Sequence, residues 1–384
     1  MQKVPVDYRG IPDHLKMMKR LSQPGQIALK RLSRLRAYFE RYTAVNAYGK
    51  GDAHVSLSFL GHPMKEKSDA FILTARTEKE LEVWVSDGGF ATGETLEIVL
   101  GLRRQLLRAA GLEKEENNPR YKLEVTWLVS HFHIDHVNEC IYYLLPCPFL
   151  RVKRIYHPRI SAYAKDTNHD ENCNGDKGIR TRFMLSQQAY QPLADMAELD
   201  FGQVLTAPLG EGSITMMMPD RDWGTPENAR EVARIYRHAE MTEEKRRKAL
   251  PVQVVNSNCI VARIDYKDRS MLLTGDAMKK NFDSNDEPLD LLVKQYGAAL
   301  RADIVKYPHH GQARHPAWKT VRDDMLIPGP DAMVVLTGHD GCNQGGKYLT
   351  ENGVAWMDVR EGTLTFTINE KGEIHRMRGE VVRL

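Results

Sequence analysis

The stretch Ser130-His131-Phe132-His133-Ile134-Asp135-His136 decides how this chain is interpreted. It places three imidazoles and one carboxylate within six positions, directly after the apolar run 123–129. Neutral ring nitrogens and an anionic oxygen are the ligands that borderline divalent metals take in proteins. The competing interpretation is structural, with polar side chains that only cap the end of a strand. The density of ligand-type groups favours a metal site.

The composition is that of an ordinary soluble protein. The chain has 384 residues, of which 42% are hydrophobic and 27% charged, enough for one large domain with an extension. Its net charge of +3 permits an anionic substrate without requiring one. The five cysteines are scattered and include no Cys-x-x-Cys pair. We therefore expect no disulfide framework and a reducing, cytoplasmic location.

Membrane insertion is not expected from the sequence. No segment approaches the roughly 18 uninterrupted apolar residues of a membrane-spanning helix. Residues 1–20 contain no apolar core of the kind found in signal peptides. These observations predict a protein without a membrane span.

Residues 1–50 form a predicted helical N-terminal extension. Apolar residues recur at near-helical spacing from Ile27 to Tyr42. The same segment carries a basic face made of Lys30, Arg31, Arg34, Arg36 and Arg41. Two roles stay open for this face: a solvated surface, or a contact with nucleic acid or a partner chain.

Residues 51–384 have the alternation of strands and helices that is typical of an α/β domain. The predicted strands cover 54–60, 70–73, 81–85, 123–129, 213–218, 259–264, 270–274, 302–307, 332–336, 363–368 and 373–377. Helices are predicted at about 96–107 and 135–145. Two insertions interrupt the domain, a polar loop region at about 160–205 and a charged helical region at about 225–250.

Other strand ends also finish in residues that can bind a metal. Asp87 lies upstream of the histidine cluster, and Asp276 and His309-His310 lie downstream. A strand-terminal Asp or His is individually common as a cap. Together with the cluster, these residues predict one site assembled from several strands.

The order of these motifs resembles the metallo-β-lactamase-fold hydrolases. The residues that carry the resemblance are Ser-Asp-Gly-Gly (86–89), His-x-His-x-Asp-His (131–136), Leu-Leu-Thr-Gly-Asp (272–276) and His-His-Gly (309–311). Within that superfamily the chain is most similar to the hydrolase domain of ComEC-type DNA-uptake proteins and their free-standing relatives. Supporting details are Asn256-Ser-Asn258, Gly362-Thr-Leu-Thr-Phe, and Ser68-Asp69-Ala70 where that family usually carries a Gly-Asp-Ala turn.

This resemblance, which covers residues 54–384, implies a four-layer αββα sandwich that binds two zinc ions, with Mn²⁺ as the alternative metal. Carried over by position, His131 and His133 would hold the first metal, and Asp135 and His136 the second. Asp276 would bridge the two ions, and His310 would complete the second site. Asp87 would orient the histidine loop from outside. Asp135 and His309 are the expected catalytic side chains, with His309 able to contact a phosphate or protonate a leaving group.

The chain departs from the superfamily pattern at two positions. A further histidine usually precedes the bridging aspartate by about twenty residues, and here Asn256 or Asn258 stands in its place. Amide oxygen is a poor zinc ligand, so we expect the first metal to be weakly held. Gln312 replaces the small hydroxyl residue that usually follows His-His-Gly, which leaves His339 as a reserve candidate for the last ligand. The histidines taken as ordinary surface or core residues are His157, His169 and His238.

The implied activity is hydrolysis by a metal-bound hydroxide. Two metals suit a phosphodiester, so a nucleic acid or a nucleotide is the expected substrate class. Basic patches at 30–41 and 245–248 agree with phosphate contacts. The alternative enzyme acts on a carbonyl substrate such as a lactone, thioester or β-lactam. A non-catalytic binding module on a degenerate metal fold is the third possibility, which the missing histidine favours and the six intact metal positions oppose.

Overall fold

The computed structural model describes fourteen stretches of the chain, and every statement below concerns them. They are residues 52–61, 69–89, 104–116, 123–131, 136–137, 150–158, 195–200, 202–219, 256, 259–277, 288–311, 317–338, 343–360 and 362–379. The expected N-terminal extension lies outside them. So does the expected insertion at 225–250, together with most of the one at 160–205.

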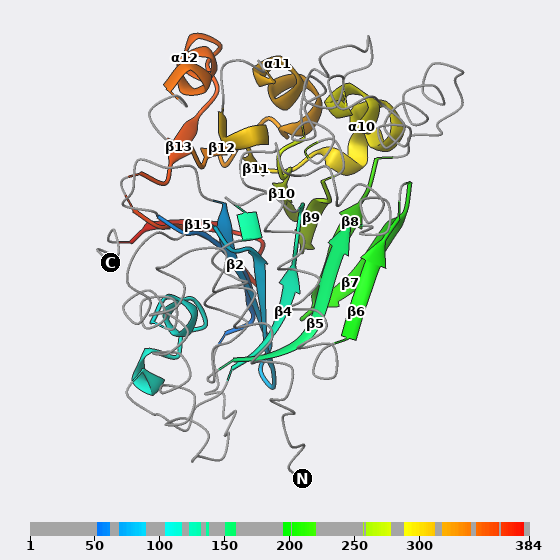
Figure 1. Cartoon of the computed structure of the whole chain (residues 1–384). Coiled ribbons are helices and arrows are strands. Elements are labelled where there is room, and N and C mark those ends of the chain that lie inside the picture. Colours follow the sequence, from blue (N-terminus) through cyan, green and yellow to red (C-terminus); the bar gives the residue numbers. More distant parts are fainter. Residues whose placement is uncertain are drawn as a thin grey trace, which may run out of the picture.

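The first sheet has eight strands among the described residues (Figure 1). They are β1 (His54–Phe59), β2 (Ala70–Arg76), β3 (Leu81–Asp87), β4 (Leu123–Leu128), β5 (Leu150–Pro158), β6 (Asp195–Leu199), β14 (Leu364–Asn369) and β15 (Ile374–Arg378). Their order is β15-β14-β1-β2-β3-β4-β5-β6. Pairing is antiparallel from β15 to β3 and parallel from β3 to β6.

The second sheet has seven described strands and is mixed in the same way. They are β7 (Val204–Leu209), β8 (Gly212–Met217), β9 (Val261–Tyr266), β10 (Arg269–Leu273), β11 (Ile304–Lys306), β12 (Met333–Leu336) and β13 (Trp356–Asp358). Their order is β13-β12-β11-β10-β9-β8-β7. Pairing is antiparallel from β7 to β10 and parallel from β10 to β13.

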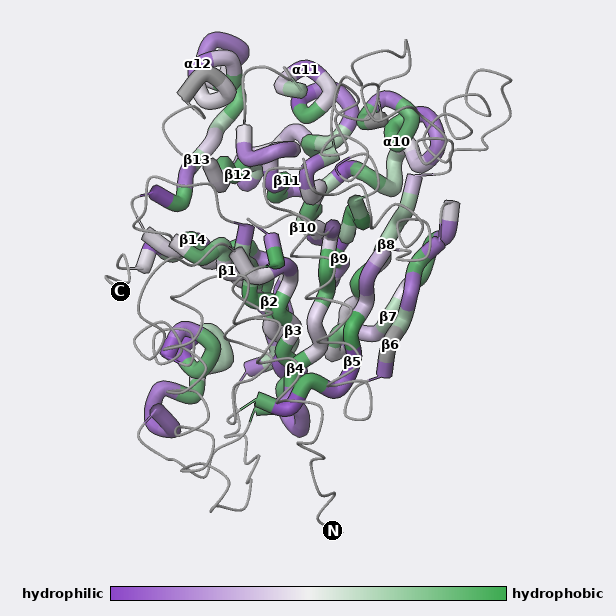
Figure 2. The backbone as a smooth tube through the Cα atoms, viewed as in Figure 1, coloured by the Kyte–Doolittle hydropathy of each residue, from purple (hydrophilic) through white to green (hydrophobic). Residues whose placement is uncertain are grey.

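The inner faces of the two sheets form one hydrophobic core. In β1, Val55, Leu57 and Phe59 face this core and are fully buried. The intervening hydroxyls of Ser56 and Ser58 point the other way and pair with threonines on β14. This period-two alternation supplies the buried area that holds the sheets together, at about 25 cal/mol per Å² of apolar surface. Figure 2 shows the central strands as largely hydrophobic and the outer helices as mixed.

Helices cover the outer faces of both sheets. The second sheet is covered by α10 (Pro288–Tyr296), α11 (Trp318–Thr320) and α12 (Asn343–Glu351), whose apolar residues form a second core with that sheet. The helical segment 104–109 covers the first sheet, and Arg76 on β2 donates a hydrogen bond to the Ala110 carbonyl at 2.7 Å. Helical turns also occur at Glu113–Glu115, Gly297–Leu300, Pro308–Gly311 and Val321–Met325. The chain therefore has the expected αββα sandwich, with two packed sheets between outer helices.

Some elements differ from the sequence prediction. Residues 195–199, inside the expected insertion at 160–205, form β6 and pair in parallel with β5. Neither β5 nor β7 nor β13 was among the predicted strands. The first half of β5 is largely exposed and carries Arg151, Lys153 and Arg154, so its apolar pattern is confined to Ile155–Pro158. Of the helix expected at 135–145, the described residues 136–137 are helical. Every described helix is too short or too polar to span a bilayer.

Candidate metal centre

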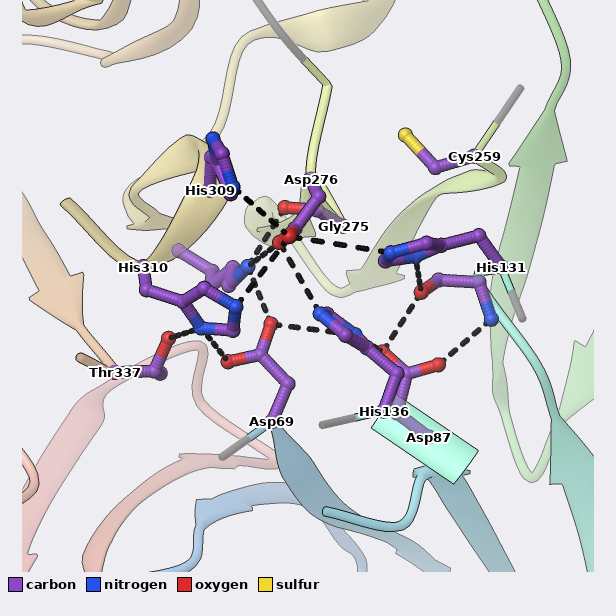
Figure 3. Close-up of polar contacts among 12 residues, drawn as sticks. Asp69, Asp87, His131, His136, Cys259, Gly275, Asp276, His309, His310 and Thr337 are labelled. Carbon is purple, nitrogen blue, oxygen red and sulfur yellow. Dashed lines mark hydrogen bonds and ion pairs between the residues drawn. The ribbon is translucent and has the colours of Figure 1, made fainter. Parts of the chain in front are cut away.

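Those predicted site residues that the structure describes meet where strands of both sheets end (Figure 3). Asp87 is the last residue of β3, and His131 follows β4. On the second sheet, Asp276 follows β10, and His309-His310 follow β11. Open α/β sheets place their ligand sites at the carboxyl ends of their strands, because neighbouring loops converge there. The expected convergence of Asp276 and His310 with the loop after β4 is thus present.

The carboxylate of Asp276 lies at the centre of four imidazoles. Oδ1 lies 3.3 Å from Nε2 of His136, and Oδ2 lies 3.3 Å from Nε2 of His310. Oδ2 also lies 3.6 Å from Nε2 of His309 and 3.9 Å from Nε2 of His131. His131, His136 and His310 are fully buried, whereas the His309 side chain is 14% exposed. All four rings turn the same nitrogen toward one carboxylate.

The opposite ring nitrogens are held from outside the centre. Nδ1 of His136 lies 3.0 Å from Oδ2 of Asp87, and Nδ1 of His310 lies 3.1 Å from Oδ1 of Asp69. Nδ1 of His131 lies 3.0 Å from the Ser130 hydroxyl. Carboxylates that bind Nδ1 fix the tautomer with Nε2 as acceptor, the arrangement found behind metal-binding histidines.

Asp87 ties the histidine loop to the end of β3. Its Oδ1 accepts a hydrogen bond from the Ser130 backbone N–H at 2.7 Å, and its Oδ2 accepts one from the Ser130 hydroxyl at 2.8 Å. Its carbonyl accepts a hydrogen bond from the Trp127 indole at 2.8 Å. Burial raises the pKa of Asp87, although the contact with His136 opposes that shift. The side chain therefore orients both His136 and the residue before His131.

The turn after β11 is strained. His309 has φ 50° and ψ 50°, and His310 has φ 60° and ψ 3°. Left-handed backbone costs a non-glycine residue roughly 1–2 kcal/mol. The His309 N–H donates to the Gly275 carbonyl at 3.3 Å, which ties this turn to the residue before Asp276. Strain of this kind persists where the surrounding structure enforces it, often at functional sites.

Two buried residues of the centre were not in the ligand set expected from the sequence. They are Asp69 and Lys306. Asp69 precedes β2, and the Ala70–Asp87 register places it beside the end of β3. It entered the sequence analysis only as part of a family-like turn. The signal for Lys306 was a lysine at a core-facing position of an apolar strand, since Ile304 faces the inter-sheet core and side chains repeat every second residue.

The centre is a network of paired charges. Burial would raise the pKa of Asp69 and Asp276, but the neighbouring Lys306 and histidines hold both well below the usual range. Burial would lower the pKa of His136, but Asp276, Asp87 and Asp69 raise it to about 10. In the same way, the two carboxylates outweigh burial and raise the pKa of Lys306. Each buried charge is compensated by an opposite one.

The residues present fit a divalent metal ion. One ligand atom from each of Asp69, His136, Asp276 and His310 lies within 4.8 Å of the others, and all four residues are buried. Nε2 of His136 is buried and makes no hydrogen bond of acceptable geometry within the described residues. A metal ion would take the place of the proton on that nitrogen, and imidazole with carboxylate suits Zn²⁺ or Mn²⁺.

Several candidate residues have other placements. His133, Asp135, Asn258 and the reserve ligand His339 lie outside the described residues, as do His169 and His238. Asn256 is buried, and its carbonyl accepts a hydrogen bond from the Cys259 N–H at 3.3 Å. Burial raises the pKa of the Cys259 thiol to about 12, so it stays neutral. His157 is buried at the end of β5, and its Nδ1 donates to the Pro158 carbonyl at 3.0 Å.

Comparison with known proteins finds similarity among solved structures. No family model matches the chain, and no curated protein matches it. Unliganded yeast PDE1 is 10% identical, with 82% of this chain and 99% of that chain covered and a TM-score of 0.42. Zn²⁺-bound PqqB from Methylobacterium extorquens is 8% identical, with coverages of 81% and 99% and a TM-score of 0.40. The MIM-2 metallo-β-lactamase is 14% identical, with coverages of 83% and 94% and a TM-score of 0.34.

Proposed function

We propose that the chain is a metal-dependent hydrolase of phosphodiesters, with nucleic acid or a nucleotide as its substrate class, related to the ComEC-type hydrolases. The observation that carries this proposal is the arrangement around Asp276. Four imidazoles turn Nε2 toward this buried carboxylate, and Asp69 and Asp87 hold two of the rings from behind. Such a preorganised set of ligand atoms is what a metallohydrolase requires.

The proposed ligand roles follow the chain order of the motifs. His131 and His133 would hold one Zn²⁺, and Asp135, His136 and His310 would hold the second. Asp276 would serve both ions. When bound, the two ions supply positive charge and activate water for attack, and Mn²⁺ can supply the same chemistry.

The protein's own groups orient and complete this centre. Asp87 fixes His136, and Asp69 fixes His310, so both rings present Nε2 without rotating. His309 is the partly exposed imidazole beside Asp276 and is placed to reach substrate. It contacts the phosphate or delivers a proton to the leaving oxygen.

The proposed pair of metal ions supports a phosphodiester over a carbonyl substrate. In phosphoryl transfer, negative charge spreads over several phosphate oxygens, whereas acyl transfer develops it on one carbonyl oxygen. Two ions would stabilise charge on both the attacking and the leaving oxygen, which favours the phosphorus substrate.

The test is turnover by protein loaded with Zn²⁺ or Mn²⁺. We expect hydrolysis of bis-p-nitrophenyl phosphate and little of nitrocefin or p-nitrophenyl acetate. Asp276→Ala should abolish turnover, whereas Asp268→Asn, in the exposed turn between β9 and β10, should retain it. Preference for nitrocefin or the acetate would favour the carbonyl substrate. Fewer than one bound ion per chain would favour a binding module, and activity that survives Asp276→Ala would refute the proposed site.

A further inference from the structure

A lysine ammonium lies inside the candidate metal centre. Lys306 is fully buried at 0% exposure, at the end of β11 and directly before the strained turn. A buried lysine is rare unless it is paired, because desolvation penalises an isolated ammonium. Its position therefore needs an explanation in terms of the groups around it.

Three oxygens surround the ammonium. Nζ makes a close ion pair with Oδ2 of Asp69, donates a hydrogen bond to the Gly275 carbonyl at 2.6 Å, and lies 3.4 Å from Oδ1 of Asp276. An ammonium has three donors and no acceptor, so these oxygens match its full capacity. Two of the three oxygens belong to residues of the four-ligand cluster.

The two oxygens of Asp69 therefore have different partners. Oδ1 lies 3.1 Å from Nδ1 of His310, whereas Oδ2 is held by Lys306. Oδ2 also lies 3.7 Å from Nδ1 of His136, which places it at the wall of the centre. Without the ammonium, a dication between His136, Asp276 and His310 could take this carboxylate as a further ligand.

We propose that Lys306 is an internal cation that competes with the second metal ion for Asp69 and Asp276. It holds Asp69 outside the ligand set, as a positioning residue for His310, and its charge weakens the binding of the second ion. The inference rests on the proposed function only in requiring that the centre binds metal. An exchangeable second ion is the consequence.

Removal of the ammonium should strengthen metal binding. In Lys306→Met the carboxylate of Asp69 is released, and the repulsion between the ammonium and the dication disappears. We expect the weaker ion to bind at least about ten-fold more tightly than in the wild type. A lysine that served only to build the site would give the opposite result, since its loss would disorder Asp69 and weaken binding.

The experiment is a titration of chelator-stripped full-length protein with Zn²⁺ and Mn²⁺ against a fluorescent chelator. It compares the wild type with Lys306→Met, Lys306→Met/Asp69→Asn and Lys347→Met, the last being a lysine on α12 that is 72% exposed. We expect tighter binding in Lys306→Met, loss of most of that gain in the double variant, and no change in Lys347→Met. Unchanged or weaker binding in Lys306→Met overturns the inference.

Folding is followed in parallel by thermal melts with and without metal. If Lys306→Met is unfolded without metal, the inference predicts that added Zn²⁺ or Mn²⁺ restores the fold, because the dication replaces the ammonium. A variant that stays unfolded with metal overturns the inference. Turnover of bis-p-nitrophenyl phosphate by the wild type tests the proposed function separately. Metal binding without turnover would leave the inference standing and remove the proposed function.

Discussion

Oδ2 of Asp87 lies 3.0 Å from Nδ1 of His136, on the side of the ring opposite Asp276. The imidazole is thus held between two carboxylates from different sheets. Asp87 is the last residue of β3, and Asp276 follows β10. The orientation of this ring therefore depends on how the two sheets pack.

Asp87→Asn should weaken metal binding while preserving the fold. The amide keeps an oxygen for the Ser130 N–H but loses the charge that fixes the His136 tautomer. We expect metal affinity to fall by about 10–100-fold. Asp87→Ala should also lower the free energy of unfolding by about 1–3 kcal/mol, since the buried Ser130 N–H loses its acceptor. Metal titration and urea unfolding of both variants would check this, and an Asp87→Asn affinity within about two-fold of wild type would contradict the orienting role.

Gly345→Ala should perturb the centre from a distance. A Cβ at Gly345, near the start of α12, would lie 2.5 Å from the Gly311 carbonyl oxygen, in the turn that carries His309 and His310. The backbone must move, so we expect weaker metal binding and a loss of about 1–3 kcal/mol in the free energy of unfolding.

Gly329→Ala is the matched control, because a Cβ at Gly329 meets nothing within 4 Å. Thermal melts and metal titration of the two variants would show whether α12 supports the turn. Equal behaviour of the two variants would show that it does not.

His309→Gly should separate catalysis from stability. Glycine adopts the left-handed backbone of this position without strain, so we expect no loss of folding stability. If His309 protonates the leaving oxygen, turnover of a dinucleotide, whose alkoxide leaving group is poor, should fall by about 10²–10⁴-fold. Turnover of bis-p-nitrophenyl phosphate should fall far less, because p-nitrophenolate leaves without a proton. Equal losses on both substrates would instead indicate that His309 contacts the phosphate.

The sequence predicted the parts of this molecule that have local signals. Period-two alternation marked β1, and the turn at Lys267-Asp268 marked the hairpin of β9 and β10, where Lys267 adopts φ 54°. Asp87, Asp276 and His310 could be selected because each follows an apolar run, and a polar residue at the end of a buried strand can be recognised in the sequence alone.

The parts that were missed depend on tertiary contacts. Lys306 had only a weak local signal, its core-facing position in an apolar strand, because the Asp69 and Asp276 carboxylates that compensate its charge lie beside other strands. Asp69 gains its role from the β2–β3 register, and the register of two strands cannot be predicted from this single sequence. β5 was missed because its exposed half carries the charges. Lys306 and Asp69 thus depend on partners elsewhere in the chain, whereas β5 was obscured by its own charged residues.

The buried His157 predicts a specific pH dependence of stability. Burial lowers its pKa from the ordinary value of 6.5, with Nδ1 donating to the Pro158 carbonyl. The folded state therefore resists protonation, whereas the unfolded state accepts a proton below about pH 6.5. The stability from the neutral ring is present above pH 6.5 and is lost as the pH falls, with a slope of up to about 1.4 kcal/mol per pH unit.

His157→Gln should remove this slope, because glutamine does not titrate. As the pH falls from about 7.5 to 5, the unfolding free energy of the wild type should therefore decrease relative to that of His157→Gln. Urea unfolding at several pH values, with His375→Gln on the exposed strand β15 as the control for a His-to-Gln change, measures that difference. A pH-independent difference would mean that the folded protein protonates His157 as readily as the unfolded chain. Burial at the end of β5 would then not set its charge state.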